Sequence, residues 1–217
     1  MFIGHFALGF AAKRAIPEAP LPALLAAPEL LDLVWPIFLL TGAETVRIAP
    51  GNTRFTPLEF VAYPWSHSLL MAAVWGALFA GTMWLATRRT AVAATVFGLV
   101  VSHWVLDWIT HRPDMPLTPA GGTKLGLGLW NFPAATLAVE GAMFAGGVAL
   151  YASATRPADR VGRYAFWALV VFLLASYLGA AFGPPPPDVR TLALGSLGLW
   201  LLPLWAWWIE RHRVPGP

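Results

Sequence analysis

The sequence predicts an all-α fold: a polytopic transmembrane helix bundle of about six spans, preceded by a short N-terminal re-entrant or interfacial helix. Of the 217 residues, 58% are hydrophobic and only 12% are charged. A soluble chain of this size has too little interior for so much apolar surface, whereas lipid accepts apolar side chains on every face of a helix. Several long runs also lack Asp, Glu, Lys and Arg, and each is long enough to cross about 30 Å of hydrocarbon as a helix. These runs are residues 60–87, 90–106, 164–187 and 191–209.

The predicted elements follow the apolar runs in chain order. The first run, Phe2–Ala12, has about half the length of a span, so we predict a re-entrant or interfacial helix there. Leu21–Leu40 is the first predicted span, and because Pro28 and Pro36 lie within it we expect a kink or break. The other five spans are predicted at Ser66–Thr87, with Ser66 as its N-cap, and at Thr90–His111, Leu127–Ala152, Tyr164–Phe182 and Thr191–Ile209.

The basic residues indicate the orientation of the bundle. An even number of spans places both termini on one side, and positive residues are enriched in cytoplasmic loops of membrane proteins. If that side is cytoplasmic, nine basic residues lie inside: Lys13, Arg14, Arg88, Arg89, Arg156, Arg160, Arg163, Arg211 and Arg213. Five lie outside: Arg47, Arg54, Arg112, Lys124 and Arg190. Both termini are therefore predicted to be cytoplasmic. Because these residues follow helix ends and form no patch, we expect no nucleic-acid partner, and the absence of Cys excludes thiolate sites.

Ionisable residues inside the predicted membrane region indicate function. Such groups cost several kcal/mol unless they are paired, hydrated or bound to a metal. A single one of them would be explained equally well by a buried hydrogen bond between helices. Three histidines and four carboxylates together are the ligand set of zinc, manganese or iron. They are His5, Glu29, Asp32, His67, His103, Asp107 and Glu140.

The strongest pattern is a pair of polar residues on the third predicted span. His103 and Asp107 are four residues apart, so they lie one above the other on a helix and can ligate one ion. Thr110 and His111 share this face. His67 begins the neighbouring antiparallel span and is therefore expected at the same depth as His103.

The other candidates depend on how their segments bend. Asp32 reaches the depth of His103 if the helix breaks at Pro36, and His5 reaches it if the short N-terminal helix dips into the membrane. Glu140 lies deeper, as a last ligand, as a base reached through water, or as a residue that orients a histidine. Asp114, with Thr110 and His111, either contacts substrate at the mouth of the site or only stabilises the end of a helix.

Taken together, several short segments resemble the bacterial inner-membrane-bound metal-dependent hydrolases. These segments are Gly4-His5-Phe6, Leu31-Asp32-Leu33, Ser66-His67-Ser68, Ser102-His103-Trp104-Val105-Leu106-Asp107, and Gly126–Trp130 followed by Glu140. The resemblance covers roughly residues 1–145 of a single predicted transmembrane domain, 1–217, whose residues 164–209 form two further spans. The order of ligands is more distantly similar to that of the soluble all-α zinc-dependent phospholipase C group.

The resemblance implies a set of metal ligands. One metal would be held by Asp32, His67, His103 and Asp107, and His5 with a shared Asp107 would help to hold a second. The chain departs from the soluble pattern at Glu140, because Thr136 stands where a histidine four residues earlier would complete a His-x-x-x-Glu pair.

Three function classes remain open at this stage. The first is a hydrolase of the bacterial inner membrane with one or two divalent metals, most simply Zn²⁺, near the outer leaflet. It would act on a phosphoester of a membrane lipid or lipid-linked small substrate, with Asp32 or Glu140 taking the proton from a metal-activated water. The second is a proton or metal-ion transporter using the same residues, although no inverted repeat is present. The third is a structural protein whose polar cluster packs helices. The oligomeric state does not follow from the sequence.

Overall fold

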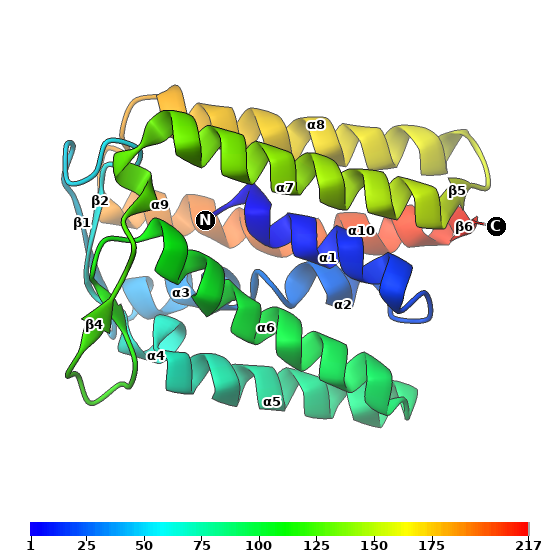
Figure 1. Cartoon of the computed structure of the whole chain (residues 1–217), viewed down its shortest axis with the longest axis horizontal. Coiled ribbons are helices and arrows are strands. Elements are labelled where there is room, and N and C mark those ends of the chain that lie inside the picture. The colour runs from blue at the N-terminus through cyan, green and yellow to red at the C-terminus, as the bar shows by residue number, and fades with distance from the viewer. Residues whose placement is uncertain (217) are drawn as a thin grey trace.

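The computed structural model describes residues 1–216 as a helical bundle whose long helices run side by side along its longest axis (Figure 1). Among these residues, five helices are long and apolar enough to cross a membrane. The all-α, polytopic fold class is therefore confirmed. The five are α5 (Leu69–Thr87), α6 (Thr90–Thr110), α7 (Pro133–Ala154), α8 (Arg160–Phe182) and a continuous segment, Val189–Arg211, made of α9 (Val189–Ser196), η2 (Leu197–Trp200) and α10 (Leu201–Arg211).

The break expected within the first predicted span is confirmed, and it leaves two short helices in place of one span. Leu21–Leu40 forms α2 (Leu21–Ala26) and α3 (Leu30–Leu40), and neither is long enough to cross alone. The break lies at Pro28, where backbone hydrogen bonds reach back three residues instead of four. A break at Pro36, which was the expected condition for Asp32 to reach the cluster, does not occur: Pro36 lies inside α3, because one proline removes only one hydrogen bond of a helix that packing can hold together.

The N-terminal helix α1 (Ile3–Ala15) starts inside the bundle and packs along α7. The two backbones approach so closely that a Cβ on Gly147 would lie 2.3 Å from the carbonyl oxygen of Ala7. Aromatic side chains of α1, α7 and α8, including Phe10, Tyr151 and Phe166, form the core on this side. Elsewhere α5 packs on α6, α3 on α9, and α10 on both α2 and α8.

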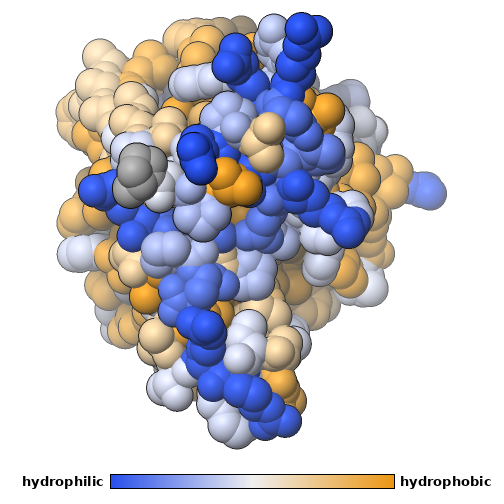
Figure 2. All heavy atoms as spheres, turned by 90° about the vertical axis from the view of Figure 1, so that its right-hand side faces the viewer, coloured by the Kyte–Doolittle hydropathy of each residue, from blue (hydrophilic) through white to orange (hydrophobic). Residues whose placement is uncertain are grey.

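One end of the bundle, on the right in Figure 1, is polar, and we call it the basic end. Viewed from that side, hydrophilic residues cover the centre of the surface and hydrophobic ones flank it (Figure 2). Ion pairs join the chain segments here, from Arg89 to Glu18 at 3.3 Å and from Lys13 to Glu210 at 2.7 Å. The strands β5 (Thr155–Pro157) and β6 (Arg213–Pro215) also pair here. The nine basic residues that were predicted to face the cytoplasm lie at helix ends and in connections at the basic end. The N-terminal residue Met1 is not at this end but buried inside the bundle.

The opposite end, which we call the loop end, carries two small hairpins that were not predicted (Figure 1). They pair β1 (Thr45–Ile48) with β2 (Leu58–Ala62), and β3 (Met115–Pro116) with β4 (Lys124–Leu125). A short helix, α4 (Pro64–His67), and a 3₁₀ turn, η1 (Leu129–Asn131), complete this end. Ser68 caps α5 by accepting a hydrogen bond from the amide of Met71, so the prediction of Ser66 as the cap is wrong. The hydroxyl of Ser66 has another role, described below.

Candidate metal centre

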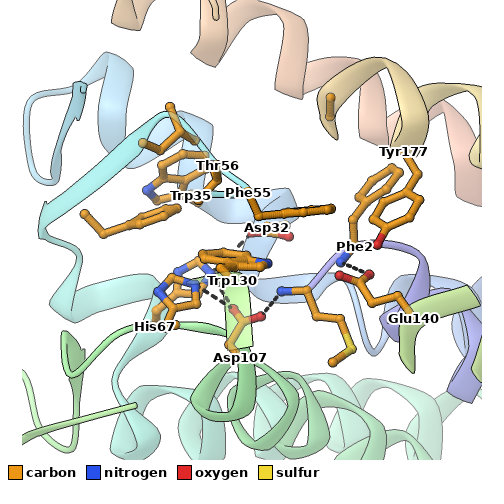
Figure 3. Close-up of a pocket in the computed structure, with 15 residues that line it drawn as sticks. Phe2, Asp32, Trp35, Phe55, Thr56, His67, Asp107, Trp130, Glu140 and Tyr177 are labelled. Atoms are coloured by element: carbon orange, nitrogen blue, oxygen red, sulfur yellow. Dashed lines mark hydrogen bonds and ion pairs between the residues drawn. The ribbon is translucent and has the colours of Figure 1, made fainter. Parts of the chain in front are cut away.

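Five of the predicted ligands converge in the half of the bundle nearer the loop end. The break at Pro28 lets α3 start at the depth of the cluster, and α4 turns its last residue inward. The side chains come from α1, α3, α4 and α6, and Figure 3 shows part of the group facing one cavity. Four of the five are at most 3% exposed. The group consists of His5, Asp32, His67, His103 and Asp107.

The ligand atoms lie at distances that suit one small divalent ion. Nε2 of His103 is 3.3 Å from Nε2 of His67 and 3.1 Å from Oδ2 of Asp107. Nε2 of His67 is 3.3 Å from Oδ1 of Asp32 and 3.9 Å from Oδ2 of Asp107. Ligand atoms about 2.0–2.1 Å from a tetrahedral zinc ion are about 3.3 Å apart. Three of these four distances match the edges of a zinc coordination sphere, whereas the 3.9 Å between His67 and Asp107 is longer.

Hydrogen bonds assign the tautomer of both central histidines. Nδ1 of His103 is 2.6 Å from the carbonyl oxygen of Pro28, which can only accept, so Nδ1 carries the hydrogen. Nδ1 of His67 is 2.6 Å from the hydroxyl of Ser66, which donates its single hydrogen to Oε2 of Glu44 at 2.6 Å. Nδ1 of His67 is therefore a donor as well. In the neutral form of each ring, Nε2 therefore carries a lone pair and no hydrogen. The two lone pairs face each other and nearby carboxylate oxygens, and such a group of electron-rich atoms attracts a cation.

Glu44 is a supporting residue that the sequence did not reveal. Its side chain is 3% exposed, and its Oε1 accepts hydrogen bonds from the amides of Trp65 and Ser66 at 2.8 and 2.7 Å. Carboxylates that hold the outer side of a ligating histidine orient the ring and raise its basicity. No spacing rule connects Glu44 with His67, because the contact joins a loop to a helix across 22 residues of chain.

His111 is oriented toward the cluster by a second network. Its Nδ1 is 2.9 Å from Oδ1 of Asp114, which also accepts from the hydroxyl of Tyr63 at 2.8 Å. Burial and the nearby negative charge of Asp114 raise the pKa of Tyr63 well above its usual value, so the phenol is a neutral donor. Nε2 of His111 then faces Oδ2 of Asp107 at 3.7 Å. Tyr63 carried no signal in the sequence.

The other oxygen of Asp107 belongs to a separate set of contacts. Oδ1 lies 3.1 Å from Nε2 of His5 and accepts a hydrogen bond from the amino group of Met1, which is also 3.3 Å from Oγ1 of Thr110. The ring of His5 stacks on that of His103 with centroids 3.9 Å apart. Asp107 thus contacts His5 through one carboxylate oxygen and His103 through the other, and His103 is the residue shared by the two groups that could hold an ion.

The two remaining predicted carboxylates do not join the converging atoms. Oε2 of Glu140 accepts from the amides of Phe2 and Gly4 at 2.8 and 3.3 Å, which places the carboxylate at the N-terminus of α1. Its Oε1 is buried and has no hydrogen-bond partner within residues 1–216, and Glu140 lines the cavity next to Tyr177 (Figure 3). Glu29 is 2% exposed at the break between α2 and α3, and both of its carboxylate oxygens lack a partner among the described residues.

A cavity of about 200 Å³ opens beside the cluster. Its polar wall contains Asp32, His67, Asp107, His111 and Glu140. The opposite wall is mainly aromatic and comes from α3, the loop end and α8. Its α8 residue, Tyr177, lies outside residues 1–145, the region in which the ligands were predicted. This aromatic wall includes Trp35, Phe55, Phe60, Trp130 and Tyr177.

Comparison with known proteins places the chain in a family. Residues 54–184, more than half of the chain, match the YdjM inner membrane protein family. The chain belongs to this family. Together with the apolar helices, membership in the YdjM family establishes a bacterial, multi-pass protein of the inner membrane. The matched range contains His67, His103 and Asp107, whereas His5 and Asp32 precede it. Neither a curated protein nor a solved structure gave a significant match.

Proposed function

We propose that this member of the YdjM family is a membrane-embedded metal-dependent hydrolase. The observation that carries the proposal is the geometry of the two central histidines. Their Nε2 atoms lie 3.3 Å apart beside Asp32 and Asp107, and hydrogen bonds on the far side of each ring leave the facing lone pairs free. Such a set is costly to bury without a cation and is the ligand chemistry of a divalent metal.

The donor set fits one zinc ion best. Two imidazoles and carboxylate oxygens are typical zinc ligands. The residues that would hold the ion are Asp32, His67 and His103, which form one group able to bind it, with Asp107 beside them. A second ion would use His5 and Oδ1 of Asp107, but the amino group of Met1 already donates to that oxygen. We therefore propose one ion in this arrangement.

The chemistry divides between the metal and the side chains of the cavity. When bound, zinc lowers the pKa of a coordinated water toward neutrality and polarises the bond to be cleaved. Asp32, whose side chain is 25% exposed, presents one oxygen to the cluster and takes the proton with the other. Glu140 is the second candidate for this base, because its Oε1 is unpartnered and the residue lines the cavity. His111, held by Asp114 at Nδ1, would supply a proton to the leaving group from Nε2 when its ring carries both protons.

The surroundings of the site support a membrane substrate. The aromatic wall faces the polar one across a space that a small phosphate group with an apolar substituent would fill. We propose a phosphoester of a lipid or a lipid-linked small molecule as the substrate class. We further propose that the basic end faces the cytoplasm, which places the cluster toward the outer leaflet.

A proton or metal-ion transporter receives less support from the packing. A transport path would have to continue from the cluster to the basic end, but buried apolar side chains occupy that part of the interior. On α1, α6 and α7 they follow the polar residues toward the basic end: Phe6, Phe10, Val92, Val96, Val100, Phe144 and Tyr151.

Elemental analysis of the detergent-purified protein tests the proposal. The parent protein is expected to carry stoichiometric zinc, and the double variant His103→Ala/Asp107→Ala is expected to carry none. His212→Ala is the matched control, because this histidine lies at the basic end, where its Nδ1 bonds to Asp159 at 2.7 Å. Metal in the parent and the control, lost only in the double variant, supports the site. A fully stable parent purified without chelators and free of metal overturns it.

A further inference from the structure

A second cavity of about 500 Å³ adjoins the first and lies between α3, α8 and α9. The two cavities share part of their walls, namely Phe2, Asp32, Trp35 and Ala180. The additional wall consists of small and apolar side chains from α8 and α9, and two prolines close it toward the loop end. These residues include Ser176, Leu192, Gly195, Ser196, Pro186 and Pro187.

Asp32 is the point at which the cluster meets this groove. Its side chain is 25% exposed, compared with 3% for His67 and 5% for Asp107. Because Asp32 lines both cavities, the accessible side of the cluster faces the space between α8 and α9. A molecule that reaches the metal ligands through the groove passes this carboxylate.

The groove opens toward lipid. Ala180 belongs to the span α8, and Gly195 belongs to the span that contains α9. α8 packs on α10 and α9 packs on α3, so the two walls are held by different neighbours. On the face of α8 that carries Ser176 and Ala180, Ala180 is exposed and the large apolar side chain of Phe172, one turn before Ser176, is 47% exposed. Within a membrane such a surface is in contact with acyl chains.

We propose that this groove binds an acyl chain of a membrane phospholipid, with the lipid phosphate at the proposed metal ion beside Asp32. The inference rests on the proposed function and extends it, since it specifies a phospholipid that enters sideways from the bilayer. The groove lies within the size range of ligand sites and is continuous with the polar cavity. An apolar chain matches its lining, while the polar cavity at the other side of Asp32 accepts the head group.

Gly195 offers a way to fill the groove without disturbing the helix. A Cβ at this position would meet no atom within 4 Å, so a leucine side chain extends into open space. Gly98 on α6 is the matched control: it too lies in a spanning helix, is exposed and has no atom within 4 Å of the added Cβ. Gly195→Leu and Gly98→Leu therefore introduce the same side chain on a lipid-facing surface, inside and outside the groove.

The test uses detergent-purified protein and phosphatidylglycerol with a photoreactive group in its acyl chain. After illumination, labelled peptides are mapped by mass spectrometry, and the metal content of each sample is measured in parallel. Labelling is expected on residues 176–199 in the parent and in Gly98→Leu. In Gly195→Leu it is expected to fall about tenfold, which corresponds to about 1.4 kcal/mol of binding free energy. Metal content is expected to be equal in all three proteins.

Several results overturn the inference. The first is equal labelling of Gly195→Leu and the parent. The second is labelling of residues 176–199 that is no stronger than the labelling of α6. The third is labelling that a polyprenyl phosphate competes away but unlabelled phosphatidylglycerol does not. Chain-to-chain cross-links through the groove in place of lipid labelling also overturn it, since they identify a second copy as the occupant. A parent protein that is labelled as expected but holds no metal contradicts the proposed hydrolase and leaves the lipid groove supported.

Discussion

The hydrogen-bond chain from Glu44 through Ser66 to His67 makes a specific prediction. In Ser66→Ala the hydroxyl that accepts from Nδ1 of His67 at 2.6 Å and donates to Glu44 at 2.6 Å is removed. The ring of His67 is 3% exposed, so Nδ1 has no water to replace the lost partner. The ring is then free to rotate or change tautomer, and its Nε2 no longer points permanently at His103.

The magnitude follows from these contacts. Leaving a buried donor without its partner costs about 1–3 kcal/mol of folding free energy. Loss of a residue that orients a ligating histidine weakens metal affinity by about 10–100-fold. Glu44 keeps its two bonds to the amides of Trp65 and Ser66, so the loop is expected to stay in place. The effect on metal affinity is thus expected to exceed the effect on the fold.

The assay is competition between the purified protein and a zinc chelator, together with thermal unfolding in detergent. Ser68→Ala is the control, because Ser68 is also fully buried beside His67 but caps α5 through the amide of Met71 at 3.3 Å. It is expected to lose about 1 kcal/mol of stability as a lost helix cap and to keep its zinc affinity. Equal zinc affinity in Ser66→Ala and Ser68→Ala would refute the orienting role of Ser66.

Three further predictions concern packing, the buried carboxylate and orientation. Gly147→Ala is expected to destabilise the bundle by about 1–3 kcal/mol, because the added Cβ would lie 2.3 Å from a backbone oxygen of α1. In Gly146→Ala no neighbouring atom lies within 4 Å of the added Cβ, so this variant is expected to stabilise the helix by about 0.5–1 kcal/mol. Equal melting temperatures of Gly147→Ala and Gly146→Ala would contradict the close approach of α1 and α7 at Gly147. Glu140→Gln is expected to retain its metal and to lose less stability than Glu140→Ala, because the amide oxygen of Gln still accepts hydrogen bonds from the backbone amides at the start of α1. Elemental analysis measures the metal content. Loss of metal in the Gln variant would show that Glu140 is a ligand. A topology reporter fused after Arg213 is expected to report the cytoplasm and one inserted at Gly121 the opposite side, and the reverse pattern would move the cluster to the inner leaflet.

Hydropathy along the chain was sufficient to predict most of the bundle. The helices α5, α6 and α8 lie within four residues of their predicted ends, because an apolar run long enough to cross lipid has no alternative to a helix that satisfies its own backbone. The start of α7 was predicted six residues too early, at Leu127, because residues 129–131 form a separate 3₁₀ turn before Pro133. The pairing of His103 with Asp107 also followed from the sequence, since four residues make one helical turn. The cost of charge in lipid also singled out His5, Asp32 and His67, which the structure brings close to His103 and Asp107.

Long-range contacts decided the rest. Pro28 and Pro36 both lack an amide hydrogen, so the sequence does not show at which of them the helix breaks. In the structure the carbonyl oxygen of Pro28 accepts a hydrogen bond from His103, 75 residues away in the chain. Glu44 and Tyr63 lie in connections without periodicity, so nothing local indicates that they support His67 and His111. Local sequence was therefore enough to locate the long apolar helices and most of the ionisable residues of the cluster. Only tertiary packing decided where the first span breaks and which atoms face one another, because those contacts depend on the relative placement of helices and not on the chemistry of any one segment.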